Sequence, residues 1–157
     1  MSRVAKMSSS PRLSLSVQYA SSAQHLPTRA QFRRWIKVAL QHDAQITLRI
    51  VDEAEGRELN KSYRGRDYAT NVLTFVYGDD EPAMQSLSGD VVICAPVVER
   101  EAAAQHKDLL AHYAHLSLHA ALHLQGYQHD NDADAAEMEK LEIALMLKLR
   151  YPDPYRT

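Results

Sequence analysis

The stretch "HAALHLQGYQHD" (residues 119–130) places three histidines around one glycine. It ends a longer apolar segment, "LLAHYAHLSLHAALHLQ", whose pattern predicts a helix. On that helix His119 and His123 lie one turn apart on the same face, with about 5–6 Å between their Cβ atoms. Gly126 can adopt the left-handed conformation that ends a helix, so that His129 can turn back toward the other two. The spacing H-x-x-x-H-x-x-G-x-x-H therefore predicts three imidazoles on one metal ion.

Other interpretations of these histidines remain open. His112 and His115 lie on the same stripe, so the row could be a histidine-rich surface face with no metal. His115 with His119 is a competing ligand pair, disfavoured because it lies a turn further from the glycine and the third histidine. The metzincin peptidases share the spacing but place Glu directly after the first histidine as general base. Ala120 occupies that position here, so the pattern argues against a peptidase.

The composition is typical of one globular domain. The 157 residues are 45% hydrophobic and 24% charged, and the net charge of −2 does not indicate a nucleic-acid binder. No run approaches the ~18 apolar residues of a membrane span. The single cysteine, Cys94, cannot form an internal disulfide, and the opening segment lacks the apolar core of a secretory signal. We expect a cytoplasmic protein, with residues 1–11 as a flexible lead-in to one domain over residues 12–157.

Hydrophobic periodicity predicts the order of the elements. Strands are expected at residues 12–19, 45–52, 70–77 and 89–95. Helices are expected at residues 28–42, 53–65 and 133–149, with one long helical stretch from Pro96 to the histidines. "GDDEP" (78–82) predicts a turn. In the last helix five apolar residues are expected to face the core: Met138, Leu141, Ala144, Leu145 and Leu147. This order predicts a mixed sheet covered by helices, of the α/β or α+β class.

Four blocks of the sequence follow one another in a characteristic order. They are "LNKSYRGRDYATNVLTF" (59–75), "SGDVVI" (88–93), "HAALHLQGYQHD" (119–130) and "YPDPY" (151–155). Together they resemble the YbeY family, bacterial metal-dependent endoribonucleases that act in ribosomal RNA maturation. The resemblance implies a single-domain α+β fold, with a mixed, mostly parallel four-stranded sheet packed with about five helices.

The resemblance also implies the site and its chemistry. One Zn²⁺ per chain would be bound by His119, His123 and His129, and the family's catalytic arginine corresponds to Arg64, expected in a loop before Gly65. The implied reaction is hydrolysis of phosphodiester bonds in single-stranded RNA, in ribosomal RNA maturation and ribosome quality control. The implied partners are ribosomal RNA, the small ribosomal subunit and an assembly GTPase, with no membrane.

Basic and aromatic residues surround the catalytic arginine of this interpretation. Arg57, Lys61 and Arg66 would contact RNA phosphates, although a small basic cluster is usually an exposed face without a ligand. Tyr63 and Tyr68 could stack on bases, although buried packing is the commoner fate of such tyrosines.

Two positions depart from the family pattern. The usual Gly after the first histidine is Ala120, and the usual Asp before the third is Gln128. That Asp would be a carboxylate able to orient a ligand histidine, and Asp130 is the nearest candidate to replace it. Thr70 and Asn71, in a matching block, are expected to fix the loop that enters a strand.

Two other functions remain open beside the enzyme. One is a non-catalytic RNA or ribosome assembly factor in which zinc only stabilises the helix end. The other is a metallohydrolase acting on a different substrate, peptides included.

Overall fold

The computed structural model describes residues 10–77 and 86–156, which form four strands and five helices. In chain order these are β1 (Leu13–Ala20), α2 (Arg29–Ala39), β2 (Asp43–Val51), α3 (Glu53–Arg64), β3 (Val72–Tyr77), β4 (Ser86–Cys94), α4 (Ala95–Ala104), α5 (Leu109–Leu124) and α6 (Asp132–Lys148). The turn expected at residues 78–82 lies outside the described residues, as does most of the expected lead-in.

The four strands form one mixed sheet in the order β1-β2-β4-β3. The β1, β2 and β4 strands are parallel, and β3 pairs antiparallel with β4. Side chains alternate between two buried faces: Ile50 and Ile93 belong to one apolar cluster, and their neighbours Val51 and Val92 belong to the other. Burial on both faces is typical of parallel strands. The structure confirms the single-domain α+β fold with a mostly parallel four-stranded sheet.

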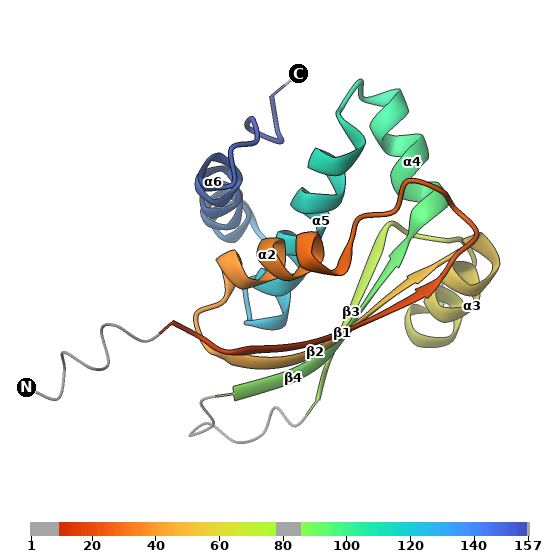
Figure 1. The fold of residues 1–157 in the computed structure, drawn as a ribbon, viewed down its shortest axis with the longest axis horizontal. Coiled ribbons are helices and arrows are strands. Elements are labelled where there is room, and N and C mark those ends of the chain that lie inside the picture. The colour runs from red at the N-terminus through yellow and green to blue at the C-terminus, as the bar shows by residue number, and fades with distance from the viewer. Residues whose placement is uncertain (1–9, 78–85, 157) are drawn as a thin grey trace, which may run out of the picture.

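The larger apolar cluster lies between the sheet and its helices. Figure 1 shows α2, α5 and α6 gathered on one side of the sheet. Phe32 of α2 makes edge-to-face contacts with Trp35 and with Tyr113 of α5, at centroid distances of 5.6 and 6.2 Å. The smaller cluster, on the other face, packs against Leu59 of α3. Within the part of the chain that the structure describes, no helix has both the length and the hydropathy to cross a membrane.

The long helical stretch expected after Pro96 is two helices, so the prediction of one continuous helix was wrong. The chain breaks after α4, where His106 adopts a positive φ of 55°. Asp108 then caps the next helix, because its side chain accepts a hydrogen bond of 3.0 Å from the backbone N–H of Ala111. After this break α5 runs in a different direction from α4 (Figure 1).

The buried face of α6 also differs from the expected one. Met138, Glu142 and Met146 are fully buried at four-residue spacing, whereas Ala144 is exposed and Leu147 is 59% exposed. The prediction was wrong for Ala144 and Leu147. The prediction was right for Met138, which is buried, and for Leu141 and Leu145, which pack against the core. A charged residue occupies the centre of the buried stripe, and hydrophobicity alone does not predict it.

The end of α5 lies directly on the sheet because β4 carries a glycine there. A Cβ atom at Gly89 would lie 2.8 Å from the carbonyl oxygen of Phe75 and 2.9 Å from a methyl carbon of Leu124. Leu124 is the last residue of α5 and the neighbour of His123. Because Gly89 has no side chain, the end of α5 that carries His123 can lie close to the sheet.

Replacing this glycine tests the close approach. We expect Gly89→Ala to lower the free energy of unfolding by about 1–3 kcal/mol, because the added methyl overpacks the contact with α5. Urea denaturation measures the change. Ser88→Ala introduces the same side chain one position earlier in β4 and should leave stability nearly unchanged. Equal stabilities for the two variants would contradict the close approach.

Candidate active site

Three imidazole rings meet at the end of α5. The ring centroids are 5.3 Å apart for His119 and His123, 5.7 Å for His119 and His129, and 5.1 Å for His123 and His129. One ring nitrogen from each residue lies within 4.8 Å of the others. A tetrahedral zinc ion with bonds of 2.0–2.1 Å separates its nitrogens by about 3.3 Å, so small ring rotations would suffice. The donor set and its spacing therefore fit a zinc ion or a similar transition metal.

A tight helix end returns the chain toward α5. Gly126 adopts a φ of 102°, and its N–H donates to the carbonyl of His123 at 3.0 Å. Gln125 anchors this turn to α2, because its amide donates to the carbonyl of Ala39 at 2.8 Å. The glycine conformation predicted from the sequence is present. As a result, His129 faces the two histidines of the helix.

The surroundings of His123 favour its neutral form. Its pKa is lowered from the usual value, first because burial disfavours a charged ring and then because His119 and His129 repel a positive charge. A neutral imidazole offers the lone pair that a metal requires.

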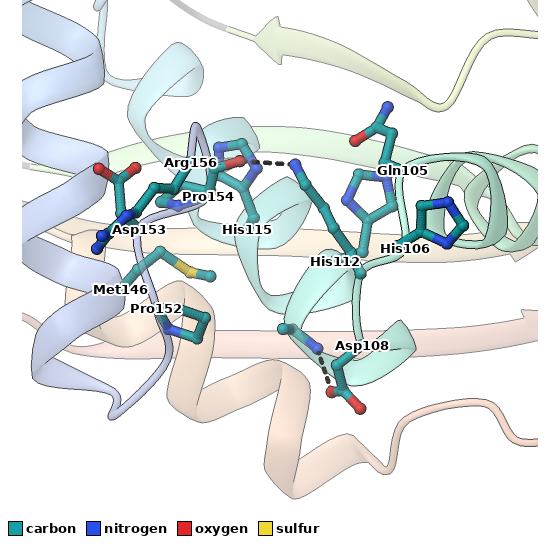
Figure 2. A pocket seen from close by; sticks show the side chains of 12 residues that line it. Gln105, His106, Asp108, His112, His115, Met146, Pro152, Asp153, Pro154 and Arg156 are labelled. Carbon is teal, nitrogen blue, oxygen red and sulfur yellow. Dashed lines mark hydrogen bonds between the residues drawn. The ribbon is translucent and has the colours of Figure 1, made fainter.

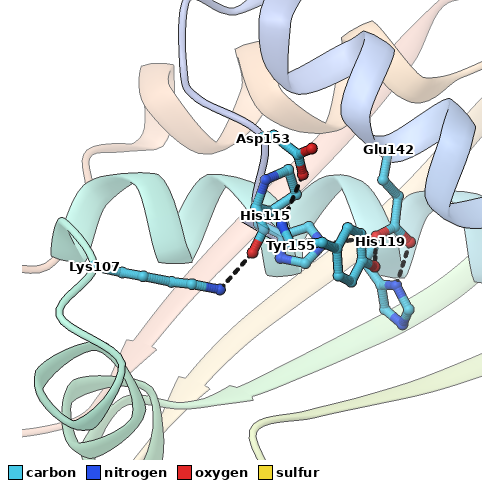
Figure 3. A network of polar contacts seen from close by, with 7 residues as sticks. Lys107, His115, His119, Glu142, Asp153 and Tyr155 are labelled. Carbon is cyan, nitrogen blue, oxygen red and sulfur yellow. Dashed lines mark hydrogen bonds and ion pairs between the residues drawn. The ribbon is translucent and has the colours of Figure 1, made fainter. Parts of the chain in front are cut away.

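A buried carboxylate contacts one histidine of the cluster, and Figure 3 shows Glu142 beside His119, His115 and Tyr155. Glu142 of α6 accepts hydrogen bonds from His119 Nδ1 at 2.5 Å and from His115 Nε2 at 2.6 Å, and a third from the hydroxyl of Tyr155. Its side chain is 0% exposed. Burial raises the pKa of this carboxyl, but the hydrogen bonds from the two histidines and Tyr155 outweigh burial and lower the pKa to about 2. Glu142 is therefore an ionised acceptor.

Glu142 was not predicted from the sequence, and the structure also corrects two interpretations of the histidine row and of Asp130. His112 and His115 are only 5% and 9% exposed, so the histidine row is not a surface face. The carboxylate that contacts a histidine of the cluster comes from Glu142 instead of Asp130, which is exposed at the edge of the site. The sequence did contain a signal: Glu142 lies four residues after Met138 and four before Met146, so all three share one face of the helix.

His115, His119 and Glu142 form a second group that could hold a metal. Glu142 lies 2.5 Å from His119 Nδ1 and 2.6 Å from His115 Nε2, so the carboxylate is paired directly with both rings. The competing pair His115–His119 is thus joined through a carboxylate.

A cleft of about 590 Å³ opens in front of the three histidines. Arg64 lines the same cleft, although it is some fifty residues from the histidines in the sequence. Arg64 is the last residue of α3, followed by Gly65 with a φ of 69°, so the expected loop position was wrong. The structure brings the arginine and the histidines to one site.

The neighbouring basic residues differ in their partners. Arg57 donates two hydrogen bonds to Asp67, at 2.7 and 3.1 Å, so its charge is already paired. Lys61 and Arg66 are exposed near the end of α3. None of these three basic residues lines the cleft.

The tyrosines of this region are exposed, so buried packing was the wrong alternative for both. Tyr63 is 66% exposed and lines the cleft, where its ring packs against Phe75 at a centroid distance of 4.9 Å. Tyr68 is 52% exposed. Asn71 also lines the cleft, and its amide donates to Glu101 at 3.1 Å, which agrees with a role in fixing this loop.

The fold and the site define an α+β protein with a three-histidine centre in a cleft that it shares with an arginine. The sequence model of the family described as "Endoribonuclease YbeY" matches residues 16–150, and the chain belongs to this family.

Relatives named endoribonuclease YbeY are similar over most of their length. The protein of Nitrosospira multiformis is 55% identical, over 92% of this chain and 82% of its own. That of Thiobacillus denitrificans is 56% identical, over 94% and 99%. A solution structure from Thermotoga maritima is 20% identical, with a TM-score of 0.52 over 90% of this chain and 99% of that one, and supports the fold alone.

The histidine cluster predicts metal binding that a single substitution removes. We expect about one Zn²⁺ per purified chain and little in His123→Ala, because two imidazoles rarely retain zinc. Elemental analysis measures the metal, and chelator should lower the melting temperature of the original protein only. His42→Ala, in the loop before β2, is the matched control. Equal zinc content in the two variants would contradict the site.

Proposed function

We propose that this protein is a zinc-dependent endoribonuclease that hydrolyses phosphodiester bonds in single-stranded RNA during ribosomal RNA maturation and ribosome quality control. The observation that carries the proposal is the shared cleft of Arg64 and the three histidines. The name of the relatives supports RNA as the substrate.

The residues of the cleft have the chemistry that phosphodiester hydrolysis needs. A zinc ion bound by the three histidines would supply Lewis-acid chemistry and would lower the pKa of a coordinated water toward ~7. A guanidinium can donate two parallel hydrogen bonds to a phosphate, and extra negative charge develops on the phosphate oxygens during hydrolysis. We assign this role to Arg64, which lies at the end of α3 and lines the same cleft as the histidines.

The outer part of the cleft suits single-stranded RNA. Tyr63 presents an exposed ring on which a base can stack. Lys61, in the last turn of α3, and Arg66, just beyond that helix, are proposed contacts to the phosphates that flank the cleaved bond. Arg57 is a weaker candidate, because Asp67 already accepts both of its hydrogen bonds.

The same geometry weighs against the two alternative functions. Structural zinc sites have four protein ligands, whereas this group has three members among the described residues and opens onto a cleft. Ala120, where a metzincin has its catalytic Glu, is fully buried in the core. The arrangement therefore favours a catalytic centre without the metzincin base.

The cellular setting follows from the proposed reaction. We propose ribosomal RNA, the small ribosomal subunit and an assembly GTPase as partners, and the cytoplasm as the location. These rest on the family resemblance.

Substitution of Arg64 separates an enzyme from a zinc-stabilised binding protein. We expect Arg64→Ala to reduce cleavage of single-stranded RNA by roughly ten- to a thousand-fold, or about 1.4–4 kcal/mol, because one charge-stabilising donor is lost. Arg64→Lys should recover only part, since an ammonium lacks the bidentate geometry. Single-turnover cleavage with zinc-loaded protein measures the effect.

Arg66→Ala is the control for general loss of charge. It should weaken RNA binding and reduce its salt dependence, with a smaller effect at saturating RNA. Zinc content and melting temperature should be unchanged in the three arginine variants. If residual cleavage is the same in the original protein, Arg64→Ala and His123→Ala, the activity comes from a contaminant and the assembly-factor alternative replaces the enzyme.

A further inference from the structure

Glu142 has no exposed surface, and its position needs an explanation. An ionised carboxylate in an apolar interior is costly unless hydrogen bonds compensate it. All three of its donors come from outside α6. Two of them, His115 and Tyr155, do not line the cleft. The third donor is His119, which does line the cleft.

The contact with His119 decides which nitrogen of that ring is free. A carboxylate only accepts hydrogen bonds, so the ring nitrogen at 2.5 Å, Nδ1, carries the proton. The lone pair of the neutral ring then lies on Nε2, which is the nitrogen left for the histidine cluster. The same bond limits rotation of the ring about its side-chain torsions.

We propose that Glu142 is a positioning residue that holds His119 in the tautomer and orientation required to bind the metal. The proposal rests on the zinc site of the proposed function. It assigns to α6 a part in the site that the histidine motif does not contain. The hydrogen bond from His115 holds the other carboxylate oxygen, so Glu142 is fixed from two successive turns of α5.

Tyr155 extends this arrangement to the C-terminal segment. Its hydroxyl donates to Glu142, and the segment is held nearby by Lys107, whose ammonium donates to the carbonyl of Pro154 at 2.6 Å. Figure 2 shows the cavity of about 360 Å³ that lies between this segment and the start of α5. These two hydrogen bonds attach the segment to the loop before α5 and to α6, and the Tyr155 ring packs against His115 at a centroid distance of 5.3 Å. Tyr155 thereby connects the end of the chain to a metal ligand through one carboxylate.

Zinc affinity of the purified protein tests the role of Glu142 without RNA. We expect Glu142→Gln, which keeps the shape of the side chain, to weaken Zn²⁺ binding by roughly 10–100-fold. Competition with a chromophoric chelator measures the affinity. Glu139→Gln, an exposed position on the same helix, is the matched control and should bind zinc like the original protein. Equal affinities for the two variants would overturn the proposal.

Histidine ¹⁵N NMR of the metal-free protein gives a second readout that a merely structural role would not change. His119 should be the Nδ1–H tautomer in the original protein and should shift toward Nε2–H or mixed tautomers in Glu142→Gln. If Glu142→Gln does not fold, Tyr155→Phe serves instead. It removes one donor to Glu142 and should weaken zinc binding by less than tenfold, with the tautomer retained.

Two further outcomes separate this proposal from the proposed function. Weakened zinc binding in Glu142→Gln supports the positioning role even if no preparation cleaves RNA. Binding of two zinc ions by the original protein and one by Glu142→Gln would overturn it, because His115 and Glu142 would then be ligands themselves.

Discussion

The structure depends on burying α5, a helix that carries four histidines across the middle of the molecule. Buried polar groups are costly when unpaired, so the two buried histidines, His112 and His115, need partners. His112 donates to Glu101 at 2.9 Å, and His115 donates to Glu142. His119 shares Glu142 and, with His123, turns toward the cleft. One end of the helix thus donates to two carboxylates, and the imidazoles at the other end belong to a group that could hold a metal.

The sequence alone predicted those features whose determining contacts lie close together in the chain. The pair His119 and His123 follows from helical spacing, and the return of His129 follows from Gly126. Alternating residues likewise predicted the strands at residues 12–19 and 45–52, and an apolar run predicted the one at residues 89–95. The chain order of helices and strands limited the possible sheets. These features need no knowledge of distant residues.

Long-range pairing explains what the sequence did not predict. Glu142 is 23 residues from His119, and a glutamate in a helix ordinarily reads as an exposed residue. Its burial depends on donors from α5 and the C-terminal segment, so its place in the buried face of α6 was not predicted. The break between α4 and α5 was missed because the capping role of Asp108 lies inside an otherwise continuous helical pattern. Arg64 could be assigned only through the family resemblance, since nothing local distinguishes it from Arg66.

The cleft shows why these distant segments are brought together. The end of α3 supplies a guanidinium, α5 and its turn supply three imidazoles, and α6 supplies the carboxylate behind them. Arg64 thus belongs to the first of the family's four sequence blocks, and the three histidines belong to the third. In the proposed reaction the guanidinium and the bound zinc would stabilise negative charge on the same phosphate.

The metal dependence of RNA cleavage tests the central claim most directly. Purified protein is stripped with chelator, freed of the chelator and titrated with Zn²⁺ while cleavage of a single-stranded RNA is followed. The account predicts that cleavage is lost on stripping and returns in proportion to zinc, with saturation near one equivalent per chain. Cleavage by the stripped protein at its original rate, without added metal, would contradict it.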